Sequence, residues 1–396
     1  ANLYNLALKM GAPVIGLIDS AGLRLQEATD ALNAFGGIYM SQVKASGVIP
    51  QITAVFGTCG GGLALIPTLT DFTFMEGSKA KLFVNAPNAL DGNVITKCDT
   101  SAADFQSKEA GIVDVVADEA GILAQIRELV SMLPANNEDD LSYADCEDDL
   151  NRVCADLEAS AADPAITLPM ISDSGIFFET KAEYGKDMVT GFIKLNGTTV
   201  GAVANRSTLY DEEGNAVEEF NAEISARGCE KAAKFVEFCD AFNIPVLTLT
   251  NAAGFKATKC SEKKMAAAAA ALTYAFAEAT VPKVNVVVGK AYGSAYVTMN
   301  SKGLGADVVY AWPNAKIGMM GAKLAVKVMY PEADAKELRE KEAAYAELQN
   351  SVASAAKRGY VDSVIEAQDT RKYVIGAFEM LYTKREDRPF KKHGTV

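Results

Sequence analysis

The sequence predicts an α/β protein made of two tandem units of the same design. Short apolar segments rich in Val and Ile alternate with longer helical patterns, which is typical of parallel strands covered by helices. A turn of glycines or other small residues follows each of the main strands. Two separate pairs of segments also recur at one spacing, and this indicates an internal duplication.

The duplication is carried by four segments. GAPVIGLIDSAG at 11–22 matches NIPVLTLTNAAG at 243–254, and VIPQITAVFGTCGGG at 48–62 matches TVPKVNVVVGKAYGS at 280–294. The aligned prolines of both pairs are 232 residues apart. EAGIVDVV also echoes KRGYVDSV further along the chain. Each unit is therefore expected to run strand, turn, helix, strand, turn, helix.

In the first unit, residues 1–12 are expected to form the helix that precedes the first strand. That strand ends in the turn DSAGLR at 19–24, and the next apolar run ends in GTCGGG at 57–62. The segment that follows, LALIPTLTDF at 63–72, is expected to be a helix. Ligands of α/β units bind where strands end and helices begin, so both turns are candidate binding positions.

The second unit opens with about eighty residues before its repeated strand. They include a hairpin, whose Asn196-Gly197 pair suits a type I′ turn, and a helix near 221–242. Because only this helix has a counterpart in the first unit, we expect that the first unit has lost its opening strands, for instance through truncation or processing; the alternative is that it never had them. The alanine-rich segment 265–279 predicts a closely packed helix.

The expected domain organisation follows from the repeat. Residues 1–135 form the first unit, residues 136–165 an acidic linker, and residues 166–396 the second unit. The linker segment carries many acids and few large apolar side chains, which is typical of a solvated helix or connection.

Composition excludes several function classes. The net charge of −13 argues against nucleic acid or an anionic membrane surface as a partner. Seven scattered cysteines lack metal-site spacing, which favours reduced thiols in a cytoplasmic protein without a zinc site. The sequence shows neither a signal peptide nor a membrane-spanning run. The one histidine, His393, lies in the tail KKHGTV, which is a poor position for a catalytic imidazole.

Paired glycine turns suit the stabilisation of an oxyanion. An enolate formed from a thioester carries negative charge on oxygen, and two main-chain N–H groups with a helix N-terminus stabilise it. Glycine allows close approach because it has no Cβ. GTCGGG and DSAGLR are expected to form one such hole, and AYGSAY at 291–296 and NAAGF at 251–255 another.

The sequence resembles the carboxyltransferase subunits of biotin-dependent acyl-CoA carboxylases and decarboxylases, which have a double crotonase fold. The resemblance spans nearly the whole chain. It rests on PVIGLIDSAGLRLQE (13–27), GTCGGGLALIPTLTD (57–71), ATVPKVNVVVGKAYGSAY (279–296), AWP (311–313), MG (320–321), TRK (370–372) and KKHG (391–394).

The resemblance implies roles for particular residues. The first hole, for the acyl-CoA enolate, would use Gly61 and Gly62 with Gly22 or Leu23. The second hole, for the ureido oxygen of carboxybiotin, would use Ser294 and Ala295 with Gly254 or Phe255. Further ligand contacts are expected from Arg24, Gly60, Tyr292, Gly293, Tyr296 and Val297. Arg24 could touch the CoA phosphates, or equally form a surface salt bridge.

In the implied reaction CO₂ leaves carboxybiotin, the ureido nitrogen takes the α-proton, and the enolate captures CO₂, so no histidine is needed. The expected partners are an acyl-CoA, a separate biotin carboxyl carrier protein and further copies of this chain. These copies would form a dimer with shared sites, within a trimer of dimers. Membrane decarboxylase subunits are a further option. No biotinyl-lysine MKM motif is present.

Three positions depart from the family pattern, and two other functions stay open. Leu23 and Ser294 replace Ala and Gly without removing a main-chain donor, whereas Val297 replaces Asp and leaves the acyl specificity open. A crotonase-type hydratase or isomerase would need carboxylates over the α-carbon, for which Glu27 and Glu76 are available. A non-catalytic acyl-CoA-binding scaffold subunit is the other alternative.

Overall fold

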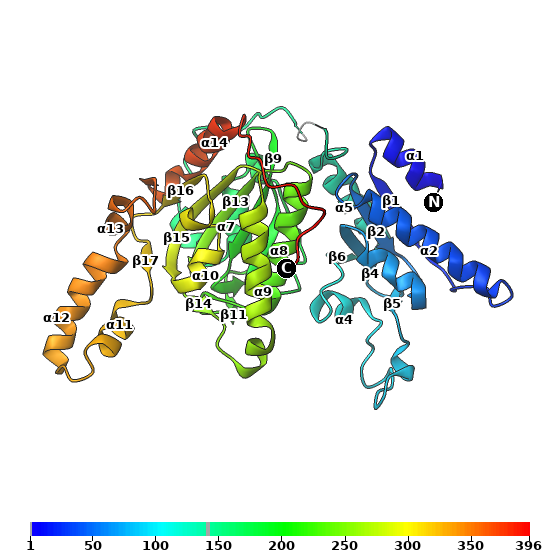
Figure 1. Cartoon of the computed structure of the whole chain (residues 1–396), viewed down its shortest axis with the longest axis horizontal. Helices are drawn as coiled ribbons and strands as arrows, with labels where there is room; N and C mark the ends of the chain where they lie inside the picture. The colour runs from blue at the N-terminus through cyan, green and yellow to red at the C-terminus, as the bar shows by residue number, and fades with distance from the viewer. Residues whose placement is uncertain (1, 140–142) are drawn as a thin grey trace. The chain divides into compact units, whose positions relative to one another are not determined.

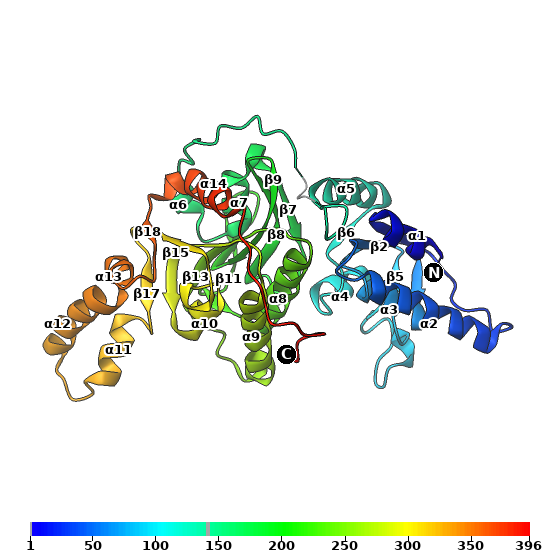
Figure 2. The ribbon, with the colours of Figure 1, turned by 45° about the horizontal axis from the view of Figure 1, so that its top comes forward.

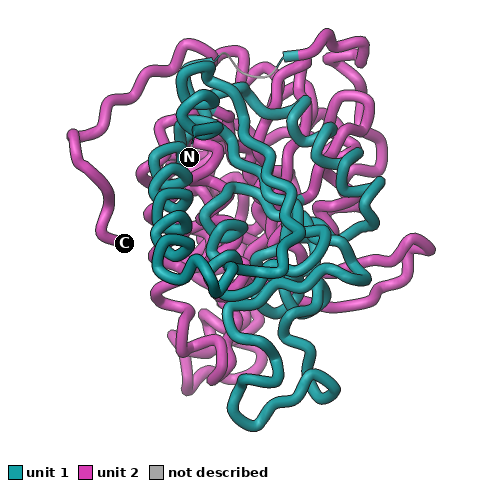
Figure 3. The backbone as a smooth tube through the Cα atoms, turned by 90° about the vertical axis from the view of Figure 1, so that its right-hand side faces the viewer, with its two compact units in different colours: residues 1–143, 180–185, 241–243 teal, residues 144–179, 186–240, 244–396 magenta. Residues whose placement is uncertain are grey.

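A computed structural model describes residues 2–139 and 143–396 of the chain, which divide into two compact units (Figure 3). Unit 1 comprises residues 1–143, 180–185 and 241–243, and unit 2 comprises residues 144–179, 186–240 and 244–396. Each unit is described by itself.

Unit 1 is built on a parallel sheet with the strand order β1-β2-β4-β6 (Figure 1). A short parallel pair, β3-β5, lies beyond β2 in the chain. The elements are α1 Asn2–Met10, β1 Val14–Ile18, α2 Ala28–Ala45, β2 Gln51–Val55, β3 Thr58–Gly60, the 3₁₀ helix η1 Gly61–Ala64, α3 Leu65–Thr68, β4 Phe72–Glu76, β5 Lys81–Phe83, α4 Ala103–Lys108, β6 Val115–Ala117 and α5 Glu119–Met132.

Burial explains why these segments form strands. β2 and β4 are buried along their whole length, as expected for central strands of a parallel sheet. β1 is the edge strand of the described sheet and leaves Ile15 and Leu17 exposed. The helix expected over 63–72 is shorter than predicted, because η1 and α3 together end at Thr68 and Phe72 already begins β4.

Unit 2 contains an eight-stranded sheet with the order β18-β16-β15-β13-β9-β8-β7, where β17 also pairs with β15. Its elements are α6 Leu157–Ser160, α7 Pro164–Ile171, β7 Phe177–Thr180, β8 Met188–Leu195, β9 Thr198–Asn205, β10 Thr208–Tyr210, β11 Ala216–Glu219, β12 Glu223–Ile224, α8 Ala226–Ala241, β13 Val246–Ala252, β14 Gly254–Phe255, α9 Lys259–Glu278, β15 Lys283–Tyr292, α10 Gly293–Thr298, β16 Val308–Ala311, β17 Lys316–Gly318, α11 Ala322–Met329, α12 Ala335–Tyr345, the π-helix η5 Ala346–Asn350, α13 Val352–Lys357, β18 Ser363–Val364 and α14 Thr370–Leu381.

Helices cover both faces of this sheet (Figure 2). One apolar cluster joins α7 and α14 to strands β8, β9, β13 and β15. On the other face, the Phe192 ring of β8 packs against Phe235 and Phe238 of α8. The result is a three-layer α/β/α unit, the class that the strand and helix pattern predicts.

The hairpin and the duplication are confirmed in the backbone. Asn196 and Gly197 have φ of +50° and +74°, which a type I′ turn between β8 and β9 requires. β1 pairs with β2 from Val14 opposite Gln51, and β13 pairs with β15 from Val246 opposite Lys283. Both partners of the second pair lie 232 residues after those of the first, so the two units share one strand register as well as one sequence pattern.

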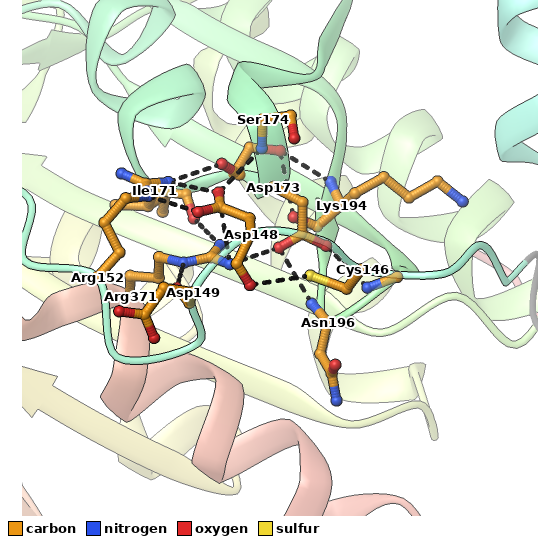
Figure 4. A network of polar contacts seen from close by, with 12 residues as sticks. Cys146, Asp148, Asp149, Arg152, Ile171, Asp173, Ser174, Lys194, Asn196 and Arg371 are labelled. Carbon is orange, nitrogen blue, oxygen red and sulfur yellow. Dashed lines mark hydrogen bonds and ion pairs between the residues drawn. The ribbon is translucent and has the colours of Figure 1, made fainter.

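The acidic segment after unit 1 is not uniformly solvated. Asp148 forms hydrogen bonds with the Arg152 guanidinium at 2.9 and 3.0 Å, and the fully buried Arg371 donates to Asp173 at 2.7 Å (Figure 4). The Arg152 hydrogen bonds are the main cause that lowers the pKa of Asp148 to about 2. Asp163 is likewise buried. The ion pair of Arg371 with Asp173 joins the segment 148–173 to α14 within unit 2. Residues 140–142 of the expected linker lie outside the described residues.

None of the helices within residues 2–139 and 143–396 has the length and apolar character that crossing a membrane requires.

Candidate functional site

The two predicted turns of unit 1 start next to each other. The Ser20 N–H donates to the Thr58 carbonyl at 3.0 Å, which holds the turn after β1 against β3. Gly61 begins η1 with φ of +62°, and Gly22 in the other turn has φ of +96°. Both values lie in the left-handed region, where residues with a Cβ are strained. These positions therefore need glycine for conformational reasons.

Main-chain donors lie at the start of η1. The first N–H groups of a helix have no acceptor inside the helix, so those of Gly61 and Gly62 begin the turn without an intrahelical partner. A Cβ on Gly61 would meet no described atom within 4 Å, so the space beside this residue is open. The Tyr39 hydroxyl donates to the Gly62 carbonyl at 2.5 Å and fixes the orientation of that peptide.

Unit 2 repeats this geometry. Gly293 begins α10 with φ of +60°, which matches Gly61 at the 232-residue spacing. The preceding residues, Gly60 and Tyr292, both have φ of −117°. The same spacing aligns Gly62 with Ser294. The donor pairs expected from the sequence, Gly61–Gly62 and Ser294–Ala295, are therefore offset by one residue between the two units.

The loops expected to share the second hole lie together. α10 packs against β14, which consists of Gly254 and Phe255. Ser294 is exposed at this turn, whereas Ala295 is 1% exposed and faces the protein interior. The fold therefore brings all four predicted residues of the second hole into one neighbourhood.

A second pair of glycines permits close approach of the strand ends in each unit. A Cβ on Gly57 would lie 1.9 Å from Oδ1 of Asp19, and a Cβ on Gly289 would lie 2.5 Å from Oδ1 of Asn251. Real Cβ atoms essentially never come this close to another atom, so a larger residue at either position would displace the facing Asp19 or Asn251 side chain. Asp19 and Asn251 also correspond at the 232-residue spacing. In each unit, one polar side chain therefore lies against the glycine of the neighbouring strand.

A cavity of about 650 Å³ opens next to α10 in unit 2. Four of the predicted residues line it, namely Gly293, Ser294, Tyr296 and Val297. Tyr292 instead lines a neighbouring cavity of about 1090 Å³ between β17 and the α11–α12 hairpin. This volume range is typical of small-molecule sites in proteins.

Sequence reasoning missed the opposite wall of the smaller cavity. That wall consists of Ile317, Gly318, Met319, Gln349, Ser354, Ala355, Arg358 and Tyr360. Arg358 donates to the Leu348 carbonyl and to Oε1 of Gln349, both at 3.1 Å, and so joins η5 to the segment after α13. The echo KRGYVDSV, which contains Arg358 and Tyr360, was the available signal.

The cavity presents neutral hydrogen-bonding groups. Burial, with the neighbouring Tyr360, raises the pKa of Tyr296 to about 12, so its phenol stays protonated at physiological pH. Burial also raises the pKa of Tyr292. In the smaller cavity, Tyr296 and the Ser294 hydroxyl can donate hydrogen bonds to a neutral or weakly charged ligand. With raised pKa values, neither Tyr296 nor Tyr292, which lines the larger cavity, can act as a base near neutral pH.

Glu76 and Glu27, the two carboxylates that a hydratase would need, both form hydrogen bonds or ion pairs within the protein. Glu76 is 6% exposed and accepts hydrogen bonds from the Ser78 hydroxyl and from the N–H groups of Ser78, Lys79 and Ala80. These bonds lower the pKa of Glu76 to about 2, which removes it as a proton donor or acceptor near neutral pH. Glu27 forms an exposed ion pair with Arg24 at 3.5 Å.

Other predicted residues have clear positions. Arg24 is 80% exposed in its pair with Glu27, and its contact with CoA stays a prediction. His393 is exposed in the C-terminal tail, which runs along α9 through contacts of Lys391 with Glu278 and Tyr274. Among the described side chains, no group of three or more His, Cys, Asp and Glu is placed to hold a metal ion.

The carboxyl transferase domain family matches residues 2–396 of the chain. The chain belongs to the carboxyl transferase family. The chain is 39% identical to the carboxyltransferase subunit of propionyl-CoA carboxylase from Haloferax mediterranei, covering 98% of this chain and 77% of that protein. It is 37% identical to the methylmalonyl-CoA decarboxylase subunit alpha of Veillonella parvula, covering 100% of this chain and 77% of that protein.

Solved structures give the same family. The structure of transcarboxylase 12S, a hexamer with hydrolysed methylmalonyl-coenzyme A bound, matches with a TM-score of 0.93 at 36% identity. The match covers 100% of this chain and 77% of that chain. The predicted family, the tandem α/β fold and the enzyme class are thereby confirmed, and the carboxyltransferase prediction is favoured over the hydratase and scaffold alternatives.

Proposed function

We propose that this carboxyl transferase moves a carboxyl group between biotin and the α-carbon of a short-chain acyl-CoA of the propionyl/methylmalonyl type. The observation that carries the proposal is the matched pair of left-handed glycines, Gly61 and Gly293, each at the start of a helix that follows a strand. Two equivalent donor sites suit a reaction with two oxyanions, one on each substrate.

The first site serves the acyl-CoA. The N–H groups of Gly61 and Gly62, with one from Gly22 or Leu23, donate to the thioester oxygen as it becomes an enolate. Such donors stabilise charge that develops in the transition state, and removing one lowers kcat by about 10²–10³-fold. The open space beside Gly61 is consistent with close approach of a thioester.

The second site serves biotin, and the residues present fit its bicyclic ring. The cavity of about 650 Å³ beside α10 is large enough, and Ser294 and Tyr296 contribute hydroxyl donors. The N–H groups of Ser294 and Ala295, with one from Gly254 or Phe255, would hold the ureido oxygen. When bound, carboxybiotin supplies the carboxyl group and the base, which accounts for a site without histidine.

Partners follow from the relatives. The named relatives act on propionyl-CoA or methylmalonyl-CoA, and transcarboxylase 12S assembles as a hexamer. We propose the same substrate class for this chain, an assembly of dimers with shared sites, and a separate biotin carrier protein. Seven free cysteines support a reducing, cytoplasmic location.

A panel assay tests the proposal. The full chain is incubated with propionyl-, acetyl-, methylmalonyl- and malonyl-CoA and with an enoyl-CoA, each with and without free biotin, and product CoA esters are separated by chromatography. Decarboxylation of methylmalonyl-CoA that depends on biotin and saturates with it supports the proposal. Hydration of an enoyl-CoA supports the hydratase, and binding of CoA esters without turnover supports the scaffold.

A further inference from the structure

The ladder between β13 and β15 is interrupted at Asn251. Thr250 lies opposite Val287, but the next paired residue, Ala252, lies opposite Ala291. β9 pairs with β13 only as far as Ala204 opposite Leu249. The main-chain N–H and C=O of Asn251 therefore lie beyond the regular pairing on both sides, and main-chain groups at such positions need other partners.

Asn205, the last residue of β9, provides both partners. Its Oδ1 accepts the N–H of Asn251 at 2.7 Å, and its Nδ2 donates to the carbonyl of Asn251. The side chain is 1% exposed. A primary amide carries the same acceptor and donor groups as a peptide unit, so this side chain extends the β9–β13 ladder by one residue.

The side chain of Asn251 in turn contacts β15, the neighbouring strand. Its own Oδ1 accepts the N–H of Lys290 at 3.0 Å, over the position where Gly289 leaves room for it. Lys290 lies three residues before Gly293, and Gly254 lies three residues after Asn251. One buried amide is therefore connected, through a single residue, to both loops of the second hole.

We propose that Asn205 is a positioning residue for the second donor site: it holds the main chain of Asn251 so that the loops at Gly254 and Ser294 keep their relative position. This role rests on the proposed function of that site. No strand of unit 1 within the described residues lies where β9 lies in unit 2, because β1 is an edge strand there.

The test variant is Asn205→Asp, which keeps the shape and the acceptor but replaces the donor with a second oxygen facing the Asn251 carbonyl. We expect kcat for biotin-dependent decarboxylation of methylmalonyl-CoA to fall about 10²-fold, because a small displacement of donors has an effect of this size. The KM for methylmalonyl-CoA should change less than about twofold. A protonated carboxyl group can donate to the carbonyl, so kcat of the variant should rise as the pH is lowered, unlike wild type.

The matched control is Gln106→Glu in unit 1. Gln106 is 6% exposed and donates through Nε2 to the carbonyls of Leu82 and Thr100, so it loses the same kind of bond away from the second hole. We expect a lower melting temperature but a kcat within about threefold of wild type. A folded Asn205→Asp protein with the kcat and pH profile of wild type would overturn the inference.

Amide hydrogen exchange keeps the two proposals distinguishable. In Asn205→Asp, residues 253–255 and 290–294 should exchange faster than in wild type, while residues 57–62 of unit 1 should not change. Unchanged exchange at 253–255 would overturn the positioning role of Asn205, whether or not the wild-type protein shows biotin-dependent turnover. Absence of biotin-dependent turnover in wild type would contradict only the proposed function. If Asn205→Asp does not fold, Asn251→Ala, which removes only the bond to Lys290, should show the same exchange pattern and a smaller loss of kcat.

Discussion

Gly61 and Gly293 are 232 residues apart and adopt the same left-handed conformation, with φ of +62° and +60°. Each follows an extended residue and begins a helix. A conformation that only glycine adopts easily has therefore been kept at equivalent positions of both units. The need for a tight turn would account for a single glycine of this kind. Two donor sites, one for each anion of the reaction, account for its presence in both units.

Gly61→Val should remove turnover of the acyl-CoA without unfolding the protein. The added side chain would enter the open space beside the first hole and also suffer backbone strain of about 1–3 kcal/mol. We expect kcat for methylmalonyl-CoA to fall by at least about 10²-fold. The control is Gly92→Val, since Gly92 has φ of +69° and the same open surroundings in a loop of unit 1 without a predicted role. Equal kcat values for the two variants would place the acyl-CoA elsewhere.

Glu76→Gln should separate carboxyl transfer from hydratase chemistry. The carboxylate accepts main-chain hydrogen bonds from residues 78–80, so its loss should reduce stability by about 1–3 kcal/mol. The transfer rate measured under folded conditions should stay within about threefold of wild type. A loss of 10²-fold or more would indicate that Glu76 moves a proton during the reaction.

Cys59→Ala tests whether the thiol in GTCGGG takes part in the chemistry. Cys59 is fully buried, and burial raises the pKa of its thiol to about 12, so little thiolate is present near neutral pH. We expect kcat to change less than about threefold and iodoacetamide to label the exposed Cys98 and Cys260 well before Cys59. Inactivation by labelling of Cys59 in the native protein would contradict this account.

Asp148→Asn should make the melting temperature depend less on pH between about pH 4 and pH 2. The folded pKa of Asp148 is about 2, below the ordinary value of about 4, so the unfolded chain binds this proton first as the pH falls. The stabilisation is present above pH 4 and is lost between about pH 4 and pH 2. Melting temperatures of wild type and variant should therefore differ most above pH 4 and converge toward pH 2. A constant difference across this range would show that Asp148 does not titrate there.

Much of the fold could be predicted from the sequence because the repeated features lie within short, continuous segments. The strand ends carry their own glycines, and the hairpin carries its own Asn196-Gly197 turn, so short segments contain the information. The helix expected over 63–72 was too long because an apolar pattern does not show where a buried strand starts. Phe72 continues that pattern but belongs to β4.

The rest depends on contacts between residues far apart in the chain. Asp163 and Asp148 look like surface acids in a charged segment, yet Asp163 is buried against Arg206 at 2.7 Å and Asp148 lies 3.6 Å from Arg371. Likewise, Met319, Gln349 and Tyr360 reach one cavity from three separate segments without a shared motif. No local pattern marks such residues, because their environment is made by the tertiary fold.

The most direct test is a crystal structure of the assembled protein soaked with methylmalonyl-CoA and free biotin. The account predicts the thioester oxygen about 2.7–3.1 Å from the main-chain nitrogens of Gly61 or Gly62, and the ureido oxygen at a similar distance from those of Ser294 or Ala295. If these nitrogens are turned away, or the two oxygens are held by side chains elsewhere, the paired donor sites do not carry the reaction.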